Sequence, residues 1–151
     1  MITNVFKALI WETLKSGTIA SLAIMPLGLV FRYFGFRIGH YGPKFAGLFI
    51  DAPQPWHLFV QHLTIGWLST TPLLLLLLLI PRSHRRTALI AALYGAGYYV
   101  VVNSLALPIY FNDPLPWQLG WGTVVPSLIA HIAFGICIAW TSRAFIQNSG
   151  A

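Results

Sequence analysis

Charged residues divide the chain into long apolar segments. Three segments contain no Asp, Glu, Lys or Arg: residues 52–81, 87–112 and 114–142. Each is longer than the about 20 apolar residues that cross the roughly 30 Å hydrocarbon core of a bilayer. A shorter apolar segment lies between Lys15 and Arg32, whose long side chains can reach opposite interfaces. The pattern predicts four transmembrane helices.

Prolines and polar residues indicate where the helices end. We place the helices at about residues 5–34, 56–80, 87–107 and 123–144. Pro108 is expected to end the third helix, and Pro126 to lie in the first turn of the fourth, where its missing N–H costs little. Glu12 and Lys15 are three residues apart in the first helix and are expected to pair on one face. The expected fold is an all-α, four-helix polytopic membrane protein, with one domain over residues 1–151.

The basic residues indicate the orientation. Residues 81–86 form a short and strongly basic turn, so we place this turn in the cytoplasm, with the loops 35–55 and 108–122 outside. The basic residues then inside are Lys7, Lys15, Arg82, Arg85, Arg86 and Arg143. Those outside are Arg32, Arg37 and Lys44. This excess predicts an N-in, C-in topology. In the first outer loop, residues 43–50 are expected to lie in the interface as a short helix.

Composition excludes several classes of protein. Hydrophobic residues make up 57% of the chain and charged residues 8%, whereas a typical soluble domain is about 25% charged. The net charge of +6 comes from residues between apolar segments, so the chain has no soluble basic patch for nucleic acid. A single cysteine, Cys137, excludes an intramolecular disulfide framework and a Cys-rich metal site.

Three polar side chains are candidates for function because polar groups inside the hydrocarbon are costly. His62, Asn103 and His131 all lie several residues from the outer ends of their predicted helices. At 1.5 Å per residue, each lies roughly 7–12 Å below the outer interface. We therefore expect one polar layer, joined through Gln61, Ser127 or a water molecule.

The polar layer has three open interpretations. Its side chains can act only as hydrogen bonds between helices. They can respond to protons, because histidine changes charge near neutral pH. Alternatively, the protein is a haem b-binding or a quinone-associated electron-transfer subunit, and in the haem alternative His62 and His131 are the axial ligands. The aromatic side chains compatible with a macrocycle are those of Trp67, Tyr98, Tyr99 and Phe134.

No motif of a known catalytic chemistry occurs in the chain. It contains no glycine-rich phosphate loop, no G-x-S-x-G sequence, no paired acids and no zinc-ligand spacing. We therefore predict a protein that is not an enzyme and has no catalytic or metal-binding residues. The leading hypothesis is an accessory or stress- and pH-related membrane component without a cofactor; the third hypothesis is a small oligomeric transporter or channel. The expected partners are the lipid bilayer and a second copy or another membrane subunit, not nucleic acid.

Small residues at helical spacing predict close packing between helices. Ala91 and Gly95 form such a pair in the third helix, and Gly17 and Ser21 form one in the first. Because small side chains allow two helix backbones to approach, we expect these pairs in seams of the bundle rather than in a dedicated dimer interface.

Four short segments within residues 56–145 form a pattern. They are Gln61-His62-Leu63, Leu105 to Ile109 around Pro108, Asp113 to Trp117, and the last helix with His131, Trp140 and Arg143. This pattern resembles the YagU-like family of small bacterial inner-membrane proteins. Asn103 stands where that family carries a histidine, which is a departure from the pattern. The resemblance implies a multi-pass protein of a bacterial cytoplasmic membrane and gives no activity.

Overall fold

The chain forms an all-α fold. The structure is a computed structural model that describes residues 2–36, 38–39, 41–79 and 83–148. Its helical elements are α1 (Ile2–Tyr33), α2 (Tyr41–Ala46), α3 (Pro55–Leu78), α4 (His84–Tyr98), the π-helical η1 (Tyr99–Ala106), α5 (Leu107–Phe111), the 3₁₀-helical η2 (Pro116–Gln118), α6 (Trp121–Thr141) and α7 (Arg143–Asn148). The described residues include no strand. The predicted fold class is confirmed.

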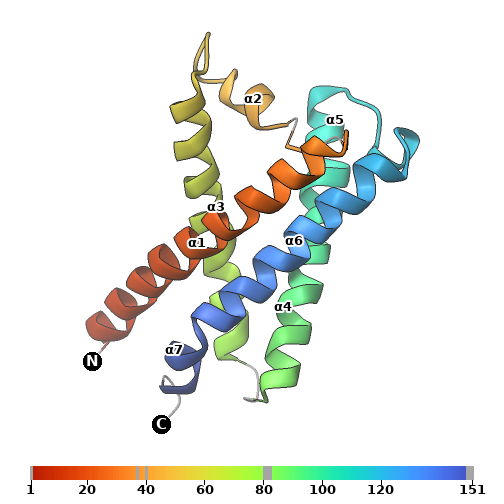
Figure 1. The fold of residues 1–151 in the computed structure, drawn as a ribbon. Coiled ribbons are helices and arrows are strands. Elements are labelled where there is room, and N and C mark those ends of the chain that lie inside the picture. Colours follow the sequence, from red (N-terminus) through yellow and green to blue (C-terminus); the bar gives the residue numbers. More distant parts are fainter. Residues whose placement is uncertain (1, 37, 40, 80–82, 149–151) are drawn as a thin grey trace.

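Four helices are long and apolar enough to cross a membrane. They span Phe6–Tyr33, Pro55–Leu78, Arg85–Phe111 and Trp121–Thr141. Figure 1 shows both chain ends at one end of the bundle, called here the terminal end, and α2 and α5 at the other, called the loop end. An even number of spans requires both termini to lie on the same side of a membrane, as they do here.

The helices pack as two pairs, α1 with α3 and α4 with α6, and the contact of α1 with α6 joins the pairs. The most extensive contacts are those of α4 with α6, of α1 with α6 and of α1 with α3, whereas α3 and α4 touch only slightly. In Figure 1, α1 accordingly crosses the bundle at an angle. The hydrophobic core at the centre of these contacts consists of Ala20, Leu73, Leu74, Leu77, Ala91, Phe134, Ile138, Ala139 and Ile146.

The seam between α4 and α6 is lined by small residues. A Cβ added to Gly95 would overlap the backbone carbonyl of His131, and one added to Gly135 would overlap the carbonyl of Ala91. The two backbones are therefore in direct contact at both levels. The predicted packing role of Ala91 and Gly95 is confirmed.

The seam between α1 and α3 has the same character. A Cβ on Gly17 would lie 2.9 Å from Thr70 Oγ1, and one on Gly66 would overlap the hydroxyl of Ser21. The predicted role of Gly17 and Ser21 in a seam of the bundle is confirmed. Nearby, the ammonium of Lys15 lies 2.7 Å from the carboxylate of Glu12, so that predicted pair is also confirmed.

The prediction that Pro108 ends the third helix is wrong. The helix continues through η1 and α5 to Phe111, with Pro108 buried. The backbone N–H of Leu107 donates to Val102, five residues earlier, as in a π-helix. A π turn is wider than an α turn, which relieves the overlap between a proline ring and the preceding turn. The helix ends at Asn112, which has the positive φ of 51°.

The other predicted boundaries differ less. α6 begins at Trp121 after Gly120, so Pro126 lies beyond the first turn, contrary to prediction. α4 begins at His84, inside the predicted turn 81–86, of which residues 81 and 82 lie outside the described residues, as does Arg37. A short helix, expected at residues 43–50, is present as α2, which begins two residues earlier and ends at Ala46; its place in the membrane interface stays a prediction.

Candidate functional site

A hydrogen-bonded pair joins the third and fourth spans. The Asn103 amide on η1 donates to Nε2 of His131 on α6. The Nδ1 of the same imidazole lies 2.6 Å from the backbone carbonyl of Ser127. A carbonyl can only accept, so the proton is on Nδ1 and the unprotonated Nε2 accepts from Asn103. The pair is therefore satisfied by neutral His131.

The π-helical segment presents Asn103 to this imidazole. π-helical turns are rare, and they are frequent at functional sites. Asn103 lies in the middle of the eight residues Tyr99–Ala106. The sequence alone predicted an ordinary helix here, so this local geometry was missed.

Two aromatic rings enclose His131. Tyr98 stacks on the imidazole with centroids 5.8 Å apart, and Tyr99 lies at 5.6 Å with its ring tilted. The hydroxyl of Tyr99 and that of neighbouring Ser104 are buried and have no hydrogen-bond partner among the described residues. Because buried polar groups are nearly always paired, these hydroxyls give the site unused hydrogen-bonding capacity.

Tyr41, the first residue of α2, lies at the loop end near this site. Its ring stacks on Phe111 at 6.0 Å, and Lys44 of the same helix pairs with Asp113 at 2.6 Å from Nζ to Oδ1. Burial raises the pKa of the Tyr41 hydroxyl, and the nearby Asp113 carboxylate and Tyr99 raise it further. Tyr99 thus faces His131 through its ring and is also an electrostatic neighbour of Tyr41.

We expect this raised pKa to appear in the alkaline stability of the protein. The folded state holds the Tyr41 proton more tightly than the unfolded chain, whose tyrosines ionise near pH 10. The stabilisation is complete below that pH and is lost as the pH rises through the folded value. Chemical unfolding in detergent from pH 9 upward should show a steeper loss for the wild type than for Tyr41→Phe. Equal slopes would contradict the assignment.

His62 lies in a different seam from the pair. Its Nε2 donates to the backbone carbonyl of Ser21 on α1, at 3.1 Å. Gln61, a predicted connector, instead donates to the carbonyl of Gly42 in α2 at 3.0 Å. No hydrogen bond or ring contact within the described ranges joins His62 to Asn103 or His131. Of the three candidates, the fold brings together Asn103 and His131.

The two histidines do not fit a pair of haem ligands as they stand. The Nε2 atoms of both imidazoles are engaged by protein groups, and ligation would break both contacts. Trp67, expected near the macrocycle, donates to Thr18 at 2.9 Å in the α1–α3 seam. No group of three His, Cys, Asp or Glu that could hold a metal occurs in the described ranges of the chain.

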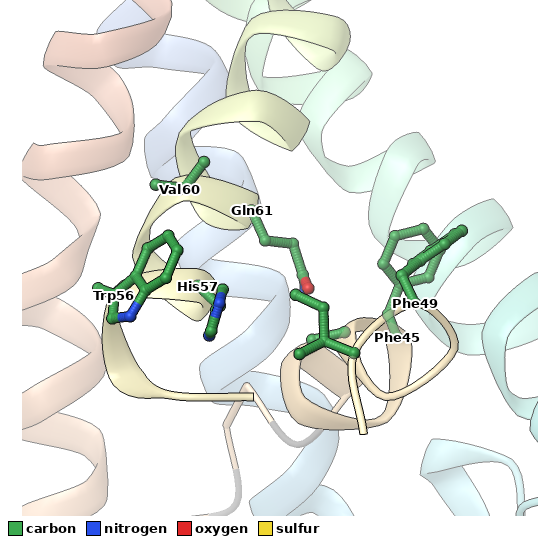
Figure 2. Close-up of a pocket in the computed structure, with 8 residues that line it drawn as sticks. Phe45, Phe49, Trp56, His57, Val60 and Gln61 are labelled. Atoms are coloured by element: carbon green, nitrogen blue, oxygen red, sulfur yellow. The ribbon is translucent and has the colours of Figure 1, made fainter. Parts of the chain in front are cut away.

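A pocket of about 230 Å³ lies at the loop end between α2 and α3. Figure 2 shows the aromatic rings of Phe45, Phe49 and Trp56 around it, with His57 and Gln61 beside them. The Nδ1 of His57 accepts the N–H of Gln54 at 2.8 Å and so caps α3, a role that the sequence did not reveal. The Gln61 amide is bound to α2. The pocket is largely apolar, and it adds no chemistry to the site.

Comparisons with known proteins identify no relative. No protein-family model, curated protein or solved structure matches the chain. The resemblance to the YagU-like family therefore stays a prediction. A proposal for function rests instead on the four apolar helices and on the Asn103–His131 pair that joins two of them.

Proposed function

We propose that the protein is a non-enzymatic membrane component that responds to acidification through protonation of His131. The observation that carries the proposal is the hydrogen bond from Asn103 to Nε2 of His131, which requires a neutral imidazole. Histidine is the side chain that changes charge near neutral pH. Purely structural hydrogen bonds between helices do not need such a group.

Protonation changes what the pair can do. A protonated Nε2 is a donor and faces the amide NH₂ of Asn103, which is also a donor. The amide must then rotate, or η1 must move away from α6. The titratable groups facing His131 are Tyr98 and Tyr99, and no carboxylate contacts it in the described part of the chain. The new charge therefore has no counterion, which favours movement.

The loop end is the side from which the proton is expected to come. Tyr99 connects the site to Tyr41 and Asp113 at that end. We assign this end to the outside of a bacterial cytoplasmic membrane, because the described residues of the basic turn, 83–86, lie at the opposite end. In this proposal the protein senses acid or is an accessory component of a stress response, alone or with a second membrane subunit.

Hydrogen exchange of the reconstituted protein tests the proposal. Between pH 7.5 and 4.5, after correction for intrinsic exchange rates, we expect residues 99–111 to lose protection by about tenfold in the wild type. The amplitude corresponds to about 1.4 kcal/mol, the scale of a lost hydrogen bond. His131→Gln should abolish the change, and Asn103→Asp should move its midpoint to higher pH by supplying a counterion.

A matched control separates this site from histidine in general. His62→Gln removes the other intramembrane histidine and should keep the transition, because His62 contacts α1 and not the pair. A transition that survives His131→Gln would overturn the proposal. An absorption spectrum of the same preparation with a Soret band, lost in both His62→Ala and His131→Ala, would instead support the haem hypothesis.

A further inference from the structure

A second pocket lies at the terminal end of the bundle. It has a volume of about 280 Å³. It lies between three elements: the start of α4, the last turns of α6, and α7. Its walls are mainly apolar and include Ile136, Ala139 and Ile146. Arg143, Trp140 and Gln147 line it as well.

Positive charge around this pocket is not neutralised by the protein. Arg143, Arg85 and Arg86 are exposed, and none of them has an ion pair among the described residues. The carboxylate of Glu12 is bound to Lys15, and the other two acidic residues lie in the loops of the opposite end. An anionic group from outside the described part of the chain would therefore find these arginines without a competing carboxylate.

We propose that the pocket binds an anionic phospholipid, with the phosphodiester at Arg143 and an acyl chain along Ile136 and Trp140. Guanidinium groups bind phosphate oxygens through paired hydrogen bonds. Tryptophan side chains favour the depth of the headgroups. Basic pockets between transmembrane helices are suited to anionic lipid headgroups. The apolar walls distinguish a lipid from a soluble phosphate ion, because they offer surface for a hydrocarbon chain.

Native mass spectrometry of the full chain tests the site. Protein released from nanodiscs of phosphatidylcholine mixed with phosphatidylglycerol should retain phosphatidylglycerol in preference. Arg143→Gln should lower that preference about fivefold, the factor that corresponds to one basic contact at a membrane surface. Lys7→Gln removes an equal charge from an exposed position of α1 and should leave the preference unchanged.

A second variant tests the pocket itself. Ala88→Trp fills the hollow from α4 without changing the charge and should also reduce lipid retention. Equal losses in Arg143→Gln and Lys7→Gln would overturn the proposal, because attraction would then be diffuse. Displacement of phosphatidylglycerol by inorganic phosphate would also overturn it and assign the arginines to a soluble anion. These outcomes are independent of the response at His131.

Discussion

A Gly95→Ala variant is expected to lose about 1–3 kcal/mol of unfolding free energy, the usual cost of overpacking. The added methyl would overlap the carbonyl of His131, which is backbone and cannot rotate away. Gly135→Ala should have a similar cost, because its methyl would overlap the carbonyl of Ala91 on the opposite helix. The helices must then separate along a seam in which dispersion contacts supply the packing energy.

Unfolding in mixed micelles, followed by circular dichroism, measures this effect. Gly97→Ala is the matched control, because Gly97 lies in the same helix as Gly95 and a methyl added there meets no packing neighbour within 4 Å. Alanine also has the higher helix propensity, so this control should be neutral or more stable. If Gly95→Ala and Gly97→Ala were equally stable, the close contact of α4 with α6 would be wrong.

Lys15→Met is expected to cost about 1–3 kcal/mol, the penalty for leaving a buried charged partner without its hydrogen bond. Glu12 is 4% exposed, and its Oε1 has no partner even in the wild type among the described residues. Without the ammonium at 2.7 Å, this carboxylate would be a buried and uncompensated charge. Lys15 itself is partly exposed, which keeps the cost below that of a fully buried pair.

Replacement of the acid separates charge from packing. Glu12→Gln in the Lys15→Met background should restore most of the lost stability, because the buried charge is then gone. A double variant as unstable as Lys15→Met would show that the alkyl chain of Lys15, and not its charge, stabilises this end of α1.

The number of spans and the small-residue seams could be predicted because they depend on local composition. Charge-free length identifies a span, and the pair Ala91–Gly95 identifies a surface that two backbones can share. The same local reasoning predicted the Glu12–Lys15 pair, because three residues fix its geometry on a helix.

The grouping of the polar residues could be predicted only in part. Counting residues gives the depth of His62, Asn103 and His131 but not their angle around each helix. Packing sets that angle: α1 lies against α3 and takes the contact of His62 with Ser21. The π turns of η1 also change the angular position of Asn103, and no residue type in the sequence specifies such a turn.

The order of the spans along the chain constrains how the molecule assembles during synthesis. N-terminal segments leave the ribosome first, so α1 and α3 can close their seam while α4 is still being made. α4 makes few contacts with α3, so it has no extensive packing surface until α6, which packs against both α4 and α1, is synthesised. A nascent chain that lacks its last span therefore has one finished hairpin beside an unattached helix.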